Sequence, residues 1–422
     1  MRDPIAGGHG DSSAREWREN WTLVLSALIG CSVPCVHIYS MGLLMAPLNQ
    51  EFGWTRGQIS ASLLLASVIG VVLAPIVGLL IDRWGSRRVG LPGVAIYTGS
   101  CALLALTGPS IWTYWAVFCL VAVGISFTTV TIWSAAVASQ FTKGRGLALG
   151  VTFCGSSLGS FITPILSEYV LSNYGWRATY WGISLGTFLY AMPILLLFFH
   201  DRRHGRPRDG QQRAPARPVA GVSRKEGLRS VRFWSIALVS LSASSVIMGL
   251  VVHFVPFVIA GGLDRTSAAF AAGLIGIASM TGRLIEGVLL DRFRATTVGA
   301  LSLLMPTIAC MAMLTYGGSL IEAMVIAAIL GASLGAEVNI MAYLTSRYFG
   351  LRSYGVLFGI VYSLIALGSG IGPLLAGLIY DWNGNYLYMM WISLPVIVLC
   401  SLRILTLGAF PDFEDKAHGK AG

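Results

Sequence analysis

The chain has 422 residues, of which 55% are hydrophobic and only 11% are charged. Soluble globular proteins carry about 25% charged residues, so this composition indicates a polytopic membrane protein. The net charge of +10 at pH 7 raises the question of nucleic acid as a partner. The basic residues argue against a nucleic-acid partner, because their positions along the chain follow a membrane topology.

Twelve apolar runs follow one another along the chain, and a helix needs about 20 such residues to cross a bilayer. We therefore predict an all-α membrane protein with twelve transmembrane helices in two pseudo-symmetric six-helix bundles. The predicted helices lie near residues 21–47, 57–81, 89–107, 112–139, 146–170, 176–199, 233–260, 266–290, 296–316, 319–346, 353–380 and 385–408.

The basic residues predict the orientation of these helices. With both ends of the chain inside, the cytoplasmic segments hold 25 of the 29 Lys and Arg residues. The outer loops keep only Arg56, Arg177 and Arg265, and Arg283 lies within the membrane. This asymmetry predicts cytoplasmic N- and C-termini in a multi-pass protein of the bacterial inner (plasma) membrane. The polar N-terminus does not match a cleavable signal peptide.

The predicted organisation has five parts. A tail of residues 1–20 precedes an N-terminal bundle of residues 21–199. Residues 200–232, which are rich in Arg, Pro and Gly and show no apolar period, form a cytoplasmic linker. A C-terminal bundle of residues 233–408 and a tail of residues 409–422 follow.

The two halves are related by an internal repeat at a fixed offset of 209 residues. The identical residues are glycines, prolines and charged residues. An even number of helices per half predicts that the two repeats are parallel, with a substrate site between them at the middle of the membrane. The matched pairs are Pro47 and Pro256, Gly53 and Gly262, Arg56 and Arg265, Gly78 and Gly287, Asp82 and Asp291, Arg83 and Arg292, Gly146 and Gly355, Gly150 and Gly359, Gly159 and Gly368, and Pro164 and Pro373.

The loop after the second predicted helix carries a compact motif that an abbreviated copy repeats in the second half. We favour a conformational latch for it over a basic loop that only sets topology. In this interpretation Gly78 allows close helix approach and Gly85 permits a tight turn. The predicted latch residues are Gly78, Asp82, Arg83, Gly85, Arg87, Arg88, Asp291 and Arg292.

This motif resembles the signature loop of the major facilitator superfamily, GxxxDRxGRR, with Ser86 in place of the first Arg of the final pair. Further stretches are similar to the monocarboxylate transporter and oxalate/formate antiporter group. They are Tyr39-Ser-Met-Gly through Pro47-Leu with Glu51–Arg56, and Lys143–Gly150. The resemblance implies two six-helix halves and alternating access. It also implies that Arg283 falls where that group carries its carboxylate-binding arginine.

The chain departs from that group at three places. Ser279 stands where monocarboxylate carriers typically have an Asp, and neither helix 1 nor residues 353–380 contain a Lys. One fixed cation would under-compensate a dicarboxylate, so a monoanion is the expected substrate.

Arg283 is the residue around which the predicted site is built. It lies eight residues before Asp291, hence about 12 Å from the end of its apolar run. A guanidinium there costs at least about 2.5–3.5 kcal/mol and almost always faces a water-filled cavity or a partner. The alternative is a structural ion pair with Glu286 or Glu337.

Other side chains in the apolar runs are candidates for the same chemistry. Glu337 lies at a depth close to that of Arg283 and is a candidate proton carrier, with a paired or permanently protonated structural role as the alternative. Helical spacing puts Asn339 about 200° around the helix from Glu337. The predicted substrate-binding residues are Arg283, Tyr39, Asn339, His253 and Tyr362, and the predicted proton-coupling residues are Glu337, His253 and Glu286.

The predicted function is secondary active transport of a small organic monocarboxylate with a proton. Anion exchange, export of an amphiphilic compound and a non-transporting membrane sensor are the alternatives. The expected partners are a small organic acid, protons and the lipid bilayer, with no nucleic acid and a monomeric chain. No enzymatic activity, cofactor or metal is expected. A zinc-binding spacing, a Walker loop or a catalytic triad would need a soluble domain, and we predict none.

Overall fold

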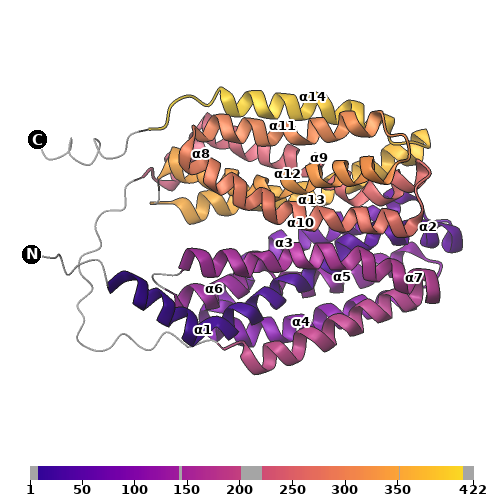
Figure 1. Cartoon of the computed structure of the whole chain (residues 1–422), viewed down its shortest axis with the longest axis horizontal. Helices are drawn as coiled ribbons and strands as arrows, with labels where there is room; N and C mark the ends of the chain where they lie inside the picture. The colour runs from indigo at the N-terminus through magenta and orange to yellow at the C-terminus, as the bar shows by residue number, and fades with distance from the viewer. Residues whose placement is uncertain (1–7, 142–144, 201–220, 351, 412–422) are drawn as a thin grey trace, which may run out of the picture. The chain divides into compact units, whose positions relative to one another are not determined.

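A computed structural model describes residues 8–141, 145–200, 221–350 and 352–411 of the chain (Figure 1). These residues are almost entirely helical. The α-helices are α1 Gly8–Ser32, α2 Val36–Phe52, α3 Arg56–Trp84, α4 Ser86–Leu103, α5 Ile111–Ser126, α6 Val130–Gln140, α7 Arg145–Phe198, α8 Arg224–Arg229, α9 Val231–Ala260, α10 Arg265–Arg292, α11 Ala295–Leu314, α12 Leu320–Phe349, α13 Tyr354–Asn383 and α14 Leu387–Leu405.

Eleven helical stretches within the described ranges are long and apolar enough to cross a membrane. The prediction of an all-α membrane protein is therefore confirmed. The count differs from twelve because α7, with 54 residues, joins the fifth and sixth predicted helices. Gly175 interrupts it with φ 80° and ψ 175°, a non-helical conformation that glycine adopts without a steric penalty.

The chain divides into two compact units, one of residues 1–44 and 69–211 and one of residues 45–68 and 212–422. The second unit thus includes a segment from the predicted N-terminal bundle. Residues 201–220 of the predicted linker lie outside the described residues, as do Lys143 and Gly144.

The end of the predicted linker is ordered within the second unit. Gly221 forms an isolated antiparallel bridge with Gly350, and Ser223 and Glu226 form a capping box at the start of α8. Reciprocal caps of this kind satisfy backbone donors that a helix start leaves open.

The repeat found in the sequence has a counterpart in the backbone of each unit. A Cβ built on Gly159 would lie 2.7 Å from the carbonyl oxygen of Ser32, and one on Gly368 would lie 2.4 Å from that of Leu241. Both pairs are related by the same offset of 209 residues. The helices α1 and α7 in one unit, and α9 and α13 in the other, therefore cross at equivalent positions that only small residues permit.

Within the second unit, α10 and α12 pack closely through small residues. A Cβ on Gly335 would lie 2.0 Å from the carbonyl oxygen of Ser279, and one on Gly282 would lie 2.5 Å from that of Ala332. A larger side chain at either glycine would separate the helices. This crossing fixes the relation between Arg283 on α10 and the polar residues of α12.

Candidate functional site

Arg283 lies one turn beyond the tightest point of the crossing between α10 and α12. The residue is half-buried, and the Nδ2 of Asn339 on α12 donates a hydrogen bond of 3.4 Å to its backbone carbonyl oxygen. Asn339 therefore contacts the backbone of the predicted binding residue. The two predicted substrate-binding residues therefore lie together.

Glu286 lies one turn further along α10 and is almost completely buried, with 2% of its surface exposed. Neither of its carboxyl oxygens has a hydrogen-bond partner among the described residues. The guanidinium of Arg283 acts on this carboxyl electrostatically, and Ser302 on α11 lies beside it. An ionised carboxylate is costly to bury without such compensation, so the charge of Glu286 depends on Arg283.

Glu337 on α12 is also buried, with 2% exposure, and its Oε1 has no hydrogen-bond partner in the described part of the chain. It faces Ser244 on α9, whereas Asn339 faces α10. The prediction that Glu337 and Asn339 occupy different faces of α12 is confirmed.

The remaining predicted substrate-binding residues lie on three other helices. Tyr362 on α13 is 45% exposed and packs near Phe358, while Tyr39 is half-buried on α2 in the first unit. His253 on α9 is only 1% exposed. Both of its ring nitrogens are engaged by protein groups, so His253 is closed to direct contact with a substrate in this conformation, and its predicted role in substrate binding stays a prediction.

The predicted latch motif between α3 and α4 is built around a sharp turn. Gly85 has φ 83° and ψ 158° and precedes the first residue of α4, which confirms the tight turn. Arg87 donates 2.7 Å hydrogen bonds to the carbonyl oxygens of Leu196 and Phe199 at the end of α7. A cation at this position compensates the open carbonyls of a helix C-terminus.

The other members of the motif are less tied to their surroundings. Arg83, Arg88 and Arg292 are exposed, and the side chains of Asp82 and Asp291 lie outside the description. A Cβ built on Gly78 would meet no described atom within 4 Å. The close helix approach expected at Gly78 is therefore not present in this structure.

Replacing Gly85 with Ala should lower the free energy of unfolding by about 1–3 kcal/mol, because its φ/ψ region is essentially restricted to glycine. Thermal unfolding in detergent would measure this. Gly78→Ala is the matched control, since Gly78 is helical and surrounded by open space. We expect this control to be neutral or stabilising. Equal loss in both variants would contradict the strained-turn account.

Sequence reasoning missed Glu168 on α7, which is 3% exposed. Its Oε1 accepts a hydrogen bond from Ser172, and its Oε2 has no partner among the residues described. The available signal was a single acidic residue inside the fifth apolar run. Its position near the end of that run made it resemble a solvated helix terminus.

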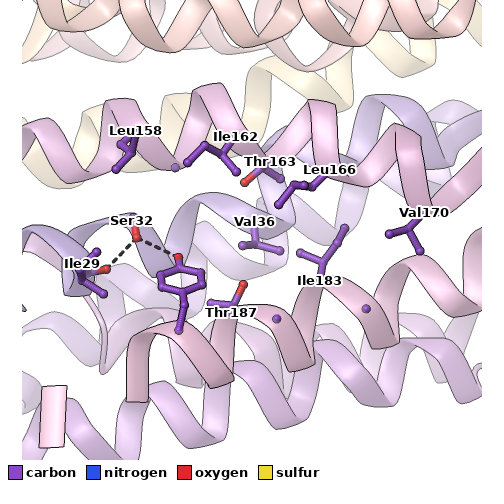
Figure 2. A pocket seen from close by; sticks show the side chains of 14 residues that line it. Ile29, Ser32, Val36, Leu158, Ile162, Thr163, Leu166, Val170, Ile183 and Thr187 are labelled. Atoms are coloured by element: carbon purple, nitrogen blue, oxygen red, sulfur yellow. Dashed lines mark hydrogen bonds between the residues drawn. The ribbon is translucent and has the colours of Figure 1, made fainter. Parts of the chain in front are cut away.

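A cavity of about 490 Å³ lies within the first unit, between α1, the start of α2 and both arms of α7 (Figure 2). Its walls are mostly aliphatic, and Figure 2 shows Ser32 joined to Ile29 by a hydrogen bond. The hydroxyl of Ser32 lies 2.7 Å from the Ile29 carbonyl oxygen and 2.9 Å from the Tyr190 hydroxyl. No charged residue lines this cavity, so it does not suit a carboxylate.

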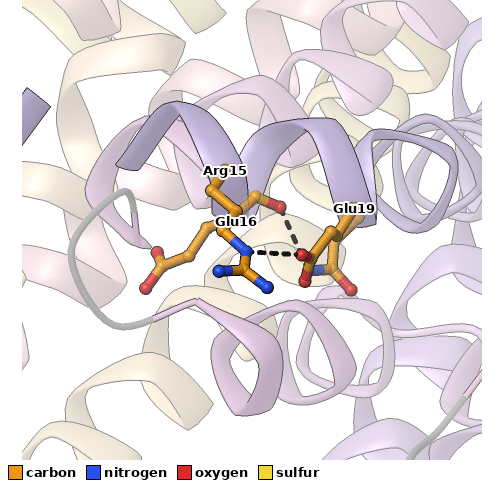
Figure 3. A network of polar contacts seen from close by, with 4 residues as sticks. Arg15, Glu16 and Glu19 are labelled. Atoms are coloured by element: carbon orange, nitrogen blue, oxygen red, sulfur yellow. Dashed lines mark hydrogen bonds and ion pairs between the residues drawn. The ribbon is translucent and has the colours of Figure 1, made fainter. Parts of the chain in front are cut away.

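Arg15 and Glu19 form an ion pair on α1 (Figure 3). The Nε of Arg15 is 2.9 Å from Oε1 of Glu19, and both side chains are largely exposed. An exposed pair of this spacing is screened by solvent and contributes little to stability. It is a local contact within α1.

The membrane-spanning helices are accompanied by a repeat in both sequence and backbone and by a buried carboxyl, Glu286, beside a membrane arginine. These features define a polytopic helical membrane protein built from two similar halves. Residues 25–362 match the sequence model of the Major Facilitator Superfamily. The chain belongs to this family, whose members are transporters, and the resemblance seen in the loop motif is confirmed.

Its relatives include transporters of different named roles. The chain is 24% identical to the agnestins efflux protein AgnL12 of Paecilomyces divaricatus, over 78% of this chain and 74% of that protein. It is 28% identical to monocarboxylate transporter 14 of Mus musculus, over 37% of this chain and 30% of that protein. A solved inward-facing bacterial homologue of the human lysosomal transporter Spinster shares the fold. It aligns with a TM-score of 0.67 and 16% identity over 96% of this chain and 100% of that structure.

Proposed function

We propose that the chain is a secondary active transporter that moves a small organic monocarboxylate together with a proton. The two halves, residues 21–199 and 233–408, would alternate access to a site at Arg283. The distribution of basic residues supports cytoplasmic termini and a location in a bacterial inner membrane. The observation that carries the proposal is a buried carboxyl, Glu286, one turn from a half-buried membrane arginine.

Charge compensation at Arg283 provides the coupling. When the site is empty, an ionised Glu286 balances the guanidinium. When a substrate carboxylate binds Arg283, a charged Glu286 would be left uncompensated in a low-dielectric environment, which is costly. Binding of the anion therefore requires a proton on Glu286, and the loaded site carries the same net charge as the empty one.

Uptake into proteoliposomes tests this mechanism. With a series of labelled monocarboxylates, an inward proton gradient should drive accumulation of about tenfold for each pH unit in a one-to-one symport. Glu286→Gln should abolish accumulation but retain exchange of internal for external substrate, because exchange needs no net proton movement. Accumulation that ignores the gradient would exclude symport.

Glu337→Gln distinguishes the two buried carboxyls. Glu337 faces α9 rather than α10, so we expect this variant to retain gradient-driven accumulation. If Glu337→Gln loses accumulation and Glu286→Gln retains it, the coupling carboxyl is Glu337 and the charge-compensation mechanism at Glu286 is wrong.

Export of an amphiphilic compound is a second candidate, supported by the apolar cavity in the first unit and the named role of the relative in Paecilomyces divaricatus. An exporter of this kind should show stimulation of transport by substrate on the opposite side without a pH gradient. Gly186 on α7 lines this cavity, so transport should also be inhibited by Gly186→Leu, which fills it.

A further inference from the structure

The N-terminus of α3 is capped by a side chain far away in the sequence. Asp381, near the end of α13, accepts hydrogen bonds from the backbone N–H of Arg56 at 3.0 Å and of Gly57 at 2.8 Å. The first N–H groups of a helix have no partner within it. Asp381 therefore stabilises the start of α3 only while this start lies against α13.

The contact continues along both helices through residues without side chains. A Cβ on Gly377 would lie 2.7 Å from the backbone N of Gly57, and one on Gly370 would lie 2.7 Å from the Cα of Leu64. Backbone contact of this closeness requires one specific arrangement. The segment of residues 45–68 is thus docked within the second unit, although the repeat assigns it to the first half of the sequence.

Arg56 connects this docked segment to a buried aromatic and imidazole cluster. Its guanidinium lies 3.6 Å from the centre of the Tyr380 ring, and its Nη1 donates a hydrogen bond to the Tyr386 hydroxyl. The Tyr386 hydroxyl lies 2.8 Å from Nδ1 of His253. A guanidinium at this distance over a tyrosine ring is attracted by the negative face of the ring.

The partners of His253 determine which ring nitrogen carries its hydrogen. Nε2 lies 3.0 Å from the carbonyl oxygen of Pro373, which can only accept, so Nε2 is the donor. Nδ1 of the neutral ring must then accept from the Tyr386 hydroxyl. The chain of hydrogen bonds runs in one direction, from Arg56 to Tyr386 to His253 to Pro373.

A second contact ties the imidazole directly to the docked segment. The hydroxyl of Ser60 on α3 lies 3.3 Å from Nε2 of His253. Both His253 and Ser60 are almost fully buried, with 1% and 0% exposure. Asp381, in contrast, is exposed, so the cap of α3 meets solvent whereas the imidazole does not.

We propose that His253, Tyr386 and Arg56 form a proton-binding site that controls the docking of residues 56–68 on α13. This inference rests on the proposed proton-coupled transport and assigns its regulation. A proton on Nδ1 converts that nitrogen from acceptor to donor. Tyr386 would then have to turn its hydrogen away, and a second positive charge would be placed beside Arg56. Protonation therefore weakens docking, and external acid releases α3 from α13.

The groups facing the imidazole support this direction. Arg56 is the cation that faces it through Tyr386, and the carboxylate of Asp381 is already engaged by two backbone N–H groups. On α12, the carboxyl of Glu337 faces α9 at Ser244, nine residues and about 14 Å along the helix from His253. Neither carboxyl is placed to compensate a new charge on the ring.

Hydrogen exchange of the full-length protein in detergent or nanodiscs, without substrate, tests the proposal. The reporters are the amides of residues 56–60, corrected for the intrinsic exchange rate at each pH. From about pH 8 to about pH 5, the range in which an imidazole titrates, we expect their protection to fall by at least about tenfold. Protection that is independent of pH would overturn the proposal.

Variants assign the effect to the imidazole. In His253→Gln, whose amide can still donate to Pro373 and accept from Tyr386, protection should be high and independent of pH. His37→Gln is the matched control, since His37 is a buried histidine of the first unit and should leave the pH response intact. An unchanged response in His253→Gln would overturn the proposal. If that variant does not fold, Tyr386→Phe should weaken the response, because it removes the hydroxyl whose hydrogen bond protonation reverses, and a full response there counts against the proposal.

The readout is independent of transport. Arg283→Lys should impair transport while the pH response of residues 56–60 persists. A persisting response in a protein that moves no carboxylate would remove the proposed function and leave the proton site. Proton-coupled uptake with no pH response in residues 56–60 would exclude the proton site and leave the proposed function intact.

Discussion

Replacing Arg283 with Gln is expected to reduce monocarboxylate uptake by at least about a hundredfold, and replacing it with Lys by at least about tenfold. Truncating one partner of a buried, hydrogen-bonded charge pair typically costs about 2–5 kcal/mol. Lysine keeps the charge but lacks the planar fork that holds a carboxylate through two parallel hydrogen bonds. Initial uptake rates in proteoliposomes, at matched protein density, measure both effects.

Arg265→Lys provides the matched control because Arg265 is exposed at the first turn of the same helix, α10. We expect its uptake to match that of the parent. If Arg283→Lys transports as well as Arg265→Lys, then Arg283 does not bind the carboxylate. Binding of a candidate acid at a hundred times its dissociation constant should also add about 2.7 kcal/mol of stability, and Arg283→Gln should lose this gain.

The second large effect is expected from Gly372→Ala, which should lower the free energy of unfolding by about 3 kcal/mol or more. A Cβ at Gly372 on α13 would lie 1.8 Å from the carbonyl oxygen of Ser245 on α9. Neither backbone can yield without separating the two helices. Denaturation of the purified protein in mixed detergent measures the loss.

Gly359→Ala on the same helix is the control for Gly372→Ala. A Cβ at Gly359 meets nothing within 4 Å, so alanine there should be neutral or stabilise the helix by about 0.5–1 kcal/mol. Similar stability of the two variants would mean that α9 and α13 are not in backbone contact at Gly372.

The fold was largely predictable because its signals are local or periodic. Apolar runs gave the spans, and the repeat at 209 residues anticipated the equivalent crossings at Gly159 and Gly368. The continuous α7 was not predicted, because a single glycine at residue 175 reads as a loop in the sequence. In the structure the non-helical backbone angles of Gly175 make the turn, and no separate loop lies between the two arms of α7.

The site was only partly predictable, because spacing along a helix gives depth and face but not the neighbouring helix. It separated Glu337 from Asn339 correctly, since both lie on α12. It could not show that Arg56, expected in an outer loop, begins a helix that Asp381 caps. That contact joins residues 325 positions apart, and no local pattern encodes it.

The one-residue turn at Gly175 has a consequence for how the first unit is made. The two arms of α7 lie side by side, since a Cβ at Gly182 would be 3.4 Å from Val170, and only the turn at Gly175 interrupts the helix between them. During biogenesis they have to enter the bilayer together as a helical hairpin. An insertion at this turn is therefore expected to impair membrane integration itself, before any effect on the mature protein.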